Sequence, residues 1–283
     1  MNNTVVNEIK GKAIYTKFAG SNYLSISDKN VKAIADTFNI EKKTVEITAI
    51  ENNIVPKRYI RNMRTLTFNE QAKLLKSSVS IVGLGGLGGT VSEIFARIGI
   101  GNINLIDGDK FEESNLNRQI LSVEKSLKIP KVLVAAKRIK AINSSISIKQ
   151  YEKFLTEKNA TKLIGNSEVV VDCLDNLKTR FLLEESCKEN NVPLVSAAVA
   201  GVLGQVTTIF PEDSGFELIF GKKKTVKLEG AEAYLGCLPF TVTMIASIEC
   251  SEVIKIFLDK GSLLRNKLLV ADLMDNTIEV FNL

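Results

Sequence analysis

The segment of this sequence with the clearest capacity for chemistry is rich in glycine. Gly83, Gly85 and Gly88 form the pattern G-x-G-x-x-G, with Gly86 inside it, and the pattern directly follows the apolar segment 79–82. Glycine lets the backbone approach a phosphate closely, and a helix that begins there points free N–H groups at the anion. The segment therefore indicates a nucleotide, while NAD, FAD and ATP all remain open.

Acidic residues follow two further apolar segments. Asp107 and Asp109 come directly after 103–106, and Asp175 comes shortly after 168–171. Because the carboxyl ends of parallel strands meet at one edge of a sheet, these acids are expected to lie beside the glycine segment. Asp107 is placed to bind ribose hydroxyls, and the Asp175 carboxylate is a hard oxygen ligand suited to Mg²⁺.

Two basic residues near these acids favour a triphosphate over a hydride carrier. Arg118 lies within the polar segment 115–119, and Lys131 follows Pro130. A triphosphate needs cations to neutralise it, whereas nicotinamide does not. The chain also contains no histidine, so any chemistry must use Asp, Glu, Lys, Arg, Cys or a bound ion. A nicotinamide dehydrogenase is therefore disfavoured.

Strand and helix signals alternate through the middle of the chain. Apolar segments typical of buried strands lie at 79–82, 103–106, 146–151, 168–171 and 193–196. Helical signals cover 69–76, 88–98, 131–142 and 177–189. The alternation predicts an α/β fold with a Rossmann-like, doubly wound and mainly parallel sheet.

The C-terminal part is expected to add antiparallel strands to that sheet. Strand signals at 205–210, 267–273 and 277–281 surround a long helical segment at 240–258. Asp275-Asn276 predicts a tight hairpin between the last two strands. The stretch 211–235, with several glycines and a run of lysines, is expected to be a mobile loop.

Residues 1–55 are predicted to be a small helical extension to an ATP-binding domain over 56–283. Ser27 can cap a helix that runs to about Phe38, and a second helix is expected at 43–52, a spacing that faintly suggests a helix-turn-helix. Residues 1–75 hold 12 Lys and Arg against 7 Asp and Glu, a net charge of +5 that equals that of the whole chain. This excess is modest and suits a solvated surface, so nucleic-acid binding is not expected.

The composition is that of a globular protein, with 45% hydrophobic and 24% charged residues. No apolar run approaches the roughly 18 residues of a membrane span, and the N-terminus lacks the apolar core of a secretory signal. A cytoplasmic location is therefore expected. The cysteines form no C-x-x-C pair, so neither a zinc site nor a redox motif is predicted; they are Cys173, Cys187, Cys237 and Cys250.

From about Arg58 to its end, roughly four-fifths of its length, the chain resembles the ThiF/MoeB/HesA family, bacterial relatives of the ubiquitin-activating enzymes. The resemblance is carried by the segment 58–62, the glycine segment, 114–119, Lys131 and 172–176, with weaker support from 236–255. It implies a homodimer that uses ATP and Mg²⁺. It also implies a partner, a small ubiquitin-like sulfur-carrier protein whose C-terminal Gly-Gly carboxylate is adenylated with release of pyrophosphate.

The resemblance also implies roles for individual residues. Asp107 would hold the ribose, Asp175 would bind Mg²⁺, and Arg61 would reach as an arginine finger into the neighbouring subunit's site. The phosphates would be surrounded by Asn115, Arg118, Gln119 and Lys131. Attack of a carboxylate on the α-phosphate joins two anions and needs no general base, so positioning and charge neutralisation can supply most of the catalysis.

Two departures from the family pattern concern cysteine. Many members carry two C-x-x-C pairs that bind a structural zinc, and both are missing here, so no zinc is expected. Members that also take the carrier as a thioester or persulfide keep a cysteine in the loop before the late glycine. Here the stretch 229–235 has none, and Cys237 follows Gly236 instead. Cys237 is a candidate nucleophile, although a small buried residue at a helix start is the commoner explanation.

The main hypothesis is thus adenylation of a sulfur carrier of the molybdopterin or thiamine type. In one alternative the chemistry is the same, but the substrate is a ribosomally made peptide or a tRNA-bound carboxylate. Residues 1–55 would then hold the peptide or bind the RNA through basic side chains. A second alternative is a nucleotide-binding regulator that uses residues 28–54 on DNA. The identity of the carrier and the sulfur donor is not encoded in these motifs.

Overall fold

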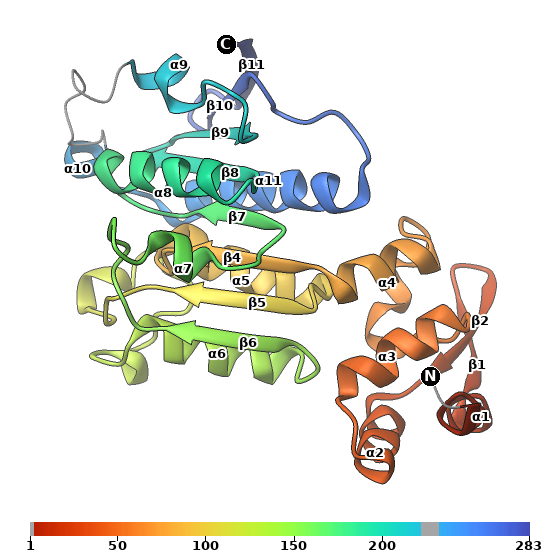
Figure 1. The fold of residues 1–283 in the computed structure, drawn as a ribbon. Helices are drawn as coiled ribbons and strands as arrows, with labels where there is room; N and C mark the ends of the chain where they lie inside the picture. The colour runs from red at the N-terminus through yellow and green to blue at the C-terminus, as the bar shows by residue number, and fades with distance from the viewer. Residues whose placement is uncertain (1–2, 222–231) are drawn as a thin grey trace.

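A computed structural model describes residues 3–221 and 232–283. Within these residues the chain forms a large sheet of eight strands in the order β11-β10-β9-β8-β7-β4-β5-β6, and a small sheet in the order β1-β2-β3. Figure 1 shows the small sheet and its helices at one end of the molecule, beside the large sheet. The order of the large sheet confirms the doubly wound α/β fold, with β4 at the point where the strand order reverses.

Parallel pairing joins the central strands, and antiparallel pairing joins the C-terminal ones. The parallel set is β4 (Ser78–Val82), β5 (Asn102–Ile106), β6 (Ser147–Tyr151), β7 (Val169–Asp172) and β8 (Leu194–Ala200). The antiparallel set is β9 (Leu203–Ile209), β10 (Lys267–Asp272) and β11 (Thr277–Asn282). The antiparallel C-terminal strands and the hairpin at Asp275-Asn276 are therefore confirmed, with Asp272 paired to Thr277 across the turn.

Helices cover both faces of the large sheet, which explains why its central strands are apolar throughout. One face carries α4 (Phe68–Lys76), α5 (Gly86–Ile98), α6 (Lys131–Ile142) and α11 (Pro239–Leu258). The other face carries α7 (Ala160–Ile164), α8 (Leu177–Glu189) and α9 (Phe216–Phe220). Neighbouring strand residues point to opposite faces. Ile81 accordingly packs in the core under α5, and Val82 packs in the core under α8.

Local signals set the ends of several helices. Thr67 caps α4 in a capping box with Glu70, and Gly99 ends α5 with a left-handed φ of 94°. Short 3-10 helices complete the connections at Lys57–Asn62 (η1), Glu113–Asn115 (η2) and Glu124–Ser126 (η3).

The N-terminal unit, which is described over residues 3–56, contains more structure than the predicted helices. The helices α2 (Asp28–Phe38) and α3 (Lys42–Glu51) are present, and Ser27 caps α2 by accepting from the backbone N–H of Asn30 at 3.2 Å. A further helix and a small sheet were not predicted; they are α1 (Asn3–Lys12), β1 (Ile14–Phe18), β2 (Ser21–Ile26) and β3 (Val55–Pro56). Val31, Ile34 and Val45 lie in a core of this unit's own.

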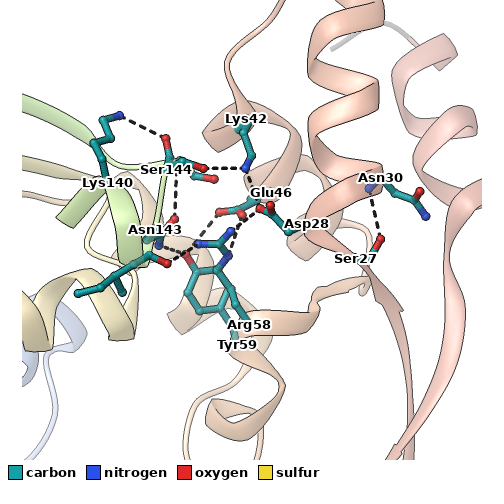
Figure 2. A network of polar contacts seen from close by, with 12 residues as sticks. Ser27, Asp28, Asn30, Lys42, Glu46, Arg58, Tyr59, Lys140, Asn143 and Ser144 are labelled. Carbon is teal, nitrogen blue, oxygen red and sulfur yellow. Dashed lines mark hydrogen bonds and ion pairs between the residues drawn. The ribbon is translucent and has the colours of Figure 1, made fainter. Parts of the chain in front are cut away.

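Buried polar groups join the N-terminal unit to the large domain (Figure 2). Glu46 of α3 is fully buried, with Arg58 Nε 3.4 Å from its Oε1 and Tyr59 Oη donating to its Oε2 at 3.4 Å. Tyr59 Oη in turn accepts from Asn143 Nδ2 at 2.7 Å, and Arg58 Nη1 donates to the carbonyl of Ile142 at 3.4 Å. The N-terminal unit is thus fastened to the C-terminal end of α6.

A second set of contacts reinforces this junction at its exposed rim. Lys42 Nζ donates to Asp28 Oδ1 and to Ser144 Oγ, both at 2.7 Å, and Arg58 also pairs with Asp28. Figure 2 shows Lys42, Asp28 and Arg58 converging beside Glu46. Burial raises the pKa of Glu46, and the positive charge of Arg58 acts in the opposite direction.

The stretch 211–235 was expected to be a mobile loop throughout, and this is wrong for two parts of it. The helix α9 occupies Phe216–Phe220, because Phe216 packs between Phe181 and Phe220 in the core under α8. A short helix, α10, covers Glu232–Leu235. The remainder of the expected loop, 222–231, lies outside the described residues. In the part of the chain that is described, no helix has both the length and the apolar character needed to cross a bilayer.

Candidate active site

A cavity of about 830 Å³ opens at the carboxyl ends of the parallel strands, where open α/β sheets bind ligands. Its wall combines the glycine segment with charged side chains from separate loops. The predicted residues that line it are Gly83, Gly85, Gly86, Asp107, Asp109, Arg118, Gln119, Lys131, Asp175 and Cys237. Three residues from the same prediction, Arg61, Gly88 and Asn115, do not line it.

The glycine segment connects β4 to α5 and must pass very close to its neighbours. Gly83 has a φ of 90°, and a Cβ placed on it would lie 2.5 Å from the carbonyl oxygen of Cys173. A Cβ on Gly88 would lie 1.8 Å from the carbonyl oxygen of Gly83. Gly88 therefore serves the packing of the loop, whereas Gly85 and Gly86 face the cavity at the start of α5. Free N–H groups at this helix start suit an anion.

Asp107 holds the glycine segment against the end of β5. Its Oδ2 accepts from the backbone N–H of Leu84 at 2.6 Å, and its Oδ1 accepts from that of Asp109 at 2.7 Å. Burial raises the pKa of Asp107, while the nearby Lys131 charge and these two hydrogen bonds act to lower it. A carboxylate oxygen can accept more than one hydrogen bond, so Asp107 still has capacity for a hydroxyl ligand.

Lys131 places a nearly buried positive charge in the cavity wall. It is the first residue of α6, and its Nζ lies 3.1 Å from Asp109 Oδ2. Its backbone N–H donates to the carbonyl of Asp109 at 2.9 Å, which fixes the start of the helix. The Asp109 side chain is itself exposed by about half, so an incoming anion can compete for the Lys131 ammonium.

The segment 115–119 contributes a second cation and an amide. Arg118 Nη1 donates to the carbonyl of Ser114 at 3.0 Å and to Asn117 Oδ1 at 2.9 Å, and it forms no ion pair with a described residue. Gln119 is buried, and its Oε1 finds no hydrogen-bond partner among the described residues. Asn115 accepts from the backbone N–H of Glu112 at 3.0 Å and so shapes the turn from outside the cavity.

Asp175 lies in an exposed turn after β7, where its Oδ1 accepts from Asn176 Nδ2 at 3.2 Å. The described residues contain no group of three or more Asp, Glu, Cys or His side chains that could hold a metal ion. Asp175 therefore belongs to no such group, although it lines the cavity. A single carboxylate suffices for Mg²⁺ that also binds substrate phosphates, since this ion keeps several waters.

A buried network beneath this turn was missed by the sequence analysis. Arg180 Nη1 lies 3.1 Å from Asp172 Oδ2 and donates to the carbonyl of Ala197 at 2.8 Å, and the same guanidinium donates to the carbonyl of Leu174. Asp172 Oδ2 also accepts from Ser196 Oγ at 2.7 Å. The network ties the turn that carries Asp175 to β8. This network is recognised only in the folded structure, where residues from separate segments come into contact.

Cys237 lies at the far wall of the cavity, next to Gly236 with its φ of 63°. Its Sγ donates to the carbonyl of Val199 at 3.6 Å, and the residue is half-buried. The other three cysteines are buried, and burial raises the pKa of each thiol. Of the four cysteines, Cys237 is therefore the one that both lines the cavity and has a side chain partly accessible to solvent.

Arg61 lies outside the cavity, on η1. Its guanidinium carbon is 4.9 Å from the centroid of the Phe18 ring, and the residue is exposed. The cavity has further lining residues that no motif indicated, chiefly Lys153, Phe154 and Leu155 directly after β6. Their position after a predicted parallel strand was the signal that could have found them.

A match to the ThiF family model covers residues 58–283, from the first residue of the predicted segment 58–62 to the last residue of the chain. The chain belongs to the ThiF family. It is 35% identical over 212 residues to the SAMP-activating enzyme E1 of Haloferax volcanii, covering 74% of this chain and 77% of that protein. It is also 35% identical over 219 residues to the molybdopterin-synthase adenylyltransferase of Haemophilus influenzae, covering 76% and 89%.

This ThiF-family chain is an adenylyltransferase, the activity named for the Haemophilus influenzae relative. Its fold is also that of E. coli MccB, solved with MccA-N7isoASN, with a TM-score of 0.70 and 21% identity. That likeness covers 96% of this chain and 95% of MccB. It therefore extends into the N-terminal unit, which lies outside the family match at 58–283.

Proposed function

We propose that the chain activates the C-terminal carboxylate of a small ubiquitin-like sulfur-carrier protein of the molybdopterin or thiamine type. A carboxylate oxygen attacks the α-phosphorus of ATP, the bond from that phosphorus to the bridging oxygen breaks, and pyrophosphate leaves with the electron pair. The products are an acyl-adenylate and pyrophosphate. The observation that carries the proposal is the cavity in which the glycine segment, Arg118, Lys131 and Asp175 meet.

The cavity residues supply positioning and charge, which this reaction needs most. The backbone of Gly85 and Gly86 would approach the phosphates, and Asp107 would bind the ribose hydroxyls. Arg118 and Lys131 would neutralise the triphosphate as the carboxylate approaches it. The carboxylate is already a nucleophile at neutral pH, so a site without histidine suffices.

The residues present fit a bound Mg²⁺. Asp175 is exposed, lies beside the cavity, and makes no ion pair with a described Lys or Arg. It would hold the ion together with substrate phosphates. When bound, Mg²⁺ would neutralise phosphate charge and make pyrophosphate a better leaving group.

We also propose that the enzyme acts as a homodimer, in which Arg61 of one copy serves the site of the other. Arg61 is exposed and does not line the cavity of its own chain. The segment 116–133, which contains Arg118 and Lys131, exposes several large apolar side chains, which a second copy would cover; they are Leu116, Ile120, Val123, Ile129 and Leu133.

A second candidate substrate is a peptide that ends in a carboxylate. The likeness to MccB, whose solved structure includes MccA-N7isoASN, covers 96% of this chain and so takes in the N-terminal unit. The matches to the H. volcanii and H. influenzae relatives cover only about three quarters of it. An N-terminal unit fastened to α6 could hold such a peptide.

Exchange of labelled pyrophosphate into ATP distinguishes these substrates. Exchange that depends on a small protein ending in Gly-Gly, and that is lost when the last glycine is removed, supports the carrier. Exchange that instead requires a short peptide supports the second candidate substrate. Exchange with neither acceptor at any concentration tested contradicts both.

A further inference from the structure

Arg61 differs from the two other arginines on the segment that joins the N-terminal unit to the large domain. Arg58 Nε lies 3.4 Å from Glu46 Oε1 in the buried junction. Arg64 Nη2 donates to the carbonyl of Ala19 at 2.6 Å. Arg61 lies between them on η1, is exposed, and forms no hydrogen bond or ion pair with a described residue. Its guanidinium therefore keeps its hydrogen-bond donors available.

The Arg61 guanidinium instead lies over the ring of Phe18, the last residue of β1. Its carbon is 4.9 Å from the ring centroid, within the roughly 6 Å of a cation–π contact. Phe18 is half-buried, and its ring centroid lies 6.5 Å from that of Tyr23 on β2. The ring that contacts Arg61 is thus itself supported by the neighbouring strand.

The hairpin between β1 and β2 fixes the Phe18 ring relative to η1. Phe18 pairs with Ser21 across a two-residue turn at 19–20, in which both residues have positive φ angles, of 47° and 82°. Arg64 Nη2 donates to Ser21 Oγ at 3.3 Å, in addition to its bond to the turn itself. The segment that carries Arg61 is therefore bonded to the turn beside Phe18, so the two side chains keep a defined separation.

A ring contact holds an arginine without cancelling its charge. The ring face attracts the cation electrostatically, and the five N–H donors of the guanidinium stay available to oxygen acceptors. A carboxylate partner, such as the one that Arg58 has, would occupy donors and compete with a phosphate for them. Arg61 is thus restrained by its own chain and still able to bind an anion from outside it.

We propose that Phe18 is a positioning residue for Arg61, which it holds in the orientation that reaches the triphosphate in the other copy's cavity. This inference rests on the proposed homodimer and deepens it by giving the N-terminal unit a part in adenylation itself. Arg61 lies inside the family match at 58–283, whereas Phe18 lies outside it. The contact therefore joins a residue of the matched domain to one of the N-terminal unit.

Substitutions at Phe18 separate a ring contact from simple packing. The readout is ATP–pyrophosphate exchange by the full chain, with whichever acceptor supports exchange in the wild type, a protein ending in Gly-Gly or a short peptide. We expect Phe18→Ala and Phe18→Leu both to lower exchange about fivefold, because leucine fills space but offers no ring face. Phe18→Tyr and Phe18→Trp keep a ring face and should stay within about twofold of the wild type.

Tyr15→Ala is the matched control on the same strand. Tyr15 is 78% exposed, and its position on β1 places it on the opposite face from Phe18. It does not line the cavity, so its substitution should leave exchange unchanged. Rescue by Phe18→Leu to the wild-type level would overturn the proposal, because packing alone would then explain the effect of Phe18→Ala.

Mixed dimers show whether Phe18 acts through Arg61. An Arg61→Ala chain supplies an intact cavity and an Asp175→Ala chain supplies an intact Arg61, so their heterodimer has one complete site. Phe18→Ala added to the Asp175→Ala chain should lower the recovered exchange about fivefold. The same change added to the Arg61→Ala chain should leave it unaltered, because the finger of that chain is already absent.

Each other outcome contradicts the proposal in a distinguishable way. Equal loss from both placements would overturn it, because a weakened fold or weaker acceptor binding would act from either chain. No loss from either placement would overturn it as well. If the mixture recovers no exchange even with Phe18 intact in both chains, the proposed action of Arg61 across subunits fails, and the role of Phe18 fails with it. If the wild type shows no exchange with either acceptor, the proposed function itself fails.

Discussion

Asp172 and Arg180 form a buried ion pair, with Arg180 Nη1 3.1 Å from Asp172 Oδ2, directly beneath the turn that carries Asp175. Asp172 ends β7, and Arg180 lies in the second turn of α8. The pair therefore links the strand to the helix across the turn. An exposed carboxylate that binds a metal ion needs such a rigid base, because its position sets the position of the ion.

Replacement of Asp172, the acidic partner in this ion pair, should destabilise the fold. Asp172→Ala leaves the Arg180 guanidinium buried without its charge partner, which costs about 3–5 kcal/mol in comparable buried pairs. Urea unfolding followed by circular dichroism measures this loss. Asp275→Ala is the control, because Asp275 is exposed in the β10–β11 turn. A loss for Asp172→Ala no larger than that of the control would contradict a structural role for the pair.

Loss of Asp175 or Arg118 should remove activity without unfolding the protein. Both side chains reach solvent in the cavity wall, and neither pairs with an oppositely charged described residue. We expect Asp175→Ala and Arg118→Ala to lower ATP–pyrophosphate exchange by at least about a hundredfold, with unfolding midpoints close to that of the wild type. Retention of more than a tenth of the exchange in either variant would rule out its assigned role.

Mixing two inactive variants tests whether Arg61 acts as an arginine finger on the site of the other subunit. Arg61→Ala and Asp175→Ala should each be inactive, whereas a heterodimer of the two keeps one site with both residues intact. With free subunit exchange, about half of the dimers are heterodimers, so roughly a quarter of the wild-type exchange should return. If the mixture shows no more activity than its separate components, Arg61 does not act across subunits.

Stability should depend on pH through Glu249. This residue of α11 is fully buried, its Oε1 has no hydrogen-bond partner among the described residues, and burial together with the Asp172 charge raises its pKa well above the usual value. An acid with a raised pKa in the folded state binds more protons folded than unfolded. Its effect therefore destabilises the fold increasingly as pH rises above about 4.5, by up to about 1.4 kcal/mol per pH unit.

Glu249→Gln isolates this effect because glutamine keeps the shape and does not titrate. The difference in unfolding free energy between Glu249→Gln and the wild type should grow in favour of the variant from pH 5 to pH 8. Ser251→Ala, a change of a non-titrating side chain at an exposed position on α11, should show a nearly constant difference. A constant difference for Glu249→Gln as well would mean that Glu249 is ionised in the fold at low pH.

The elements that the sequence predicted correctly are those with local causes. Apolar segments defined the parallel strands, and α8 covers the predicted range 177–189. Ser27 as a helix cap was visible because its side chain accepts from a backbone N–H three residues away. The strand β1 could not be predicted from the sequence, because its residues Ile14–Phe18 are mostly exposed and are ordered by pairing with β2.

The same distinction holds within the cavity. Gly85, Asp107, Lys131 and Asp175 stand at the ends of predicted strands or the start of a predicted helix, so topology alone placed them together. Arg180 and Phe154 carry no motif. The structural role of Arg180 is seen only in its contacts with residues distant in the sequence. The position of Phe154 is seen only in the packing of its ring against Gly108.

We propose above all that this cavity binds a triphosphate and not a dinucleotide hydride carrier. Isothermal titration calorimetry of one preparation with Mg·ATP and, separately, with NADH tests it most directly. We expect saturable binding of one ATP per chain, weakened at least about tenfold in Lys131→Ala, and no measurable binding of NADH. Tight binding of NADH with no binding of Mg·ATP would contradict it.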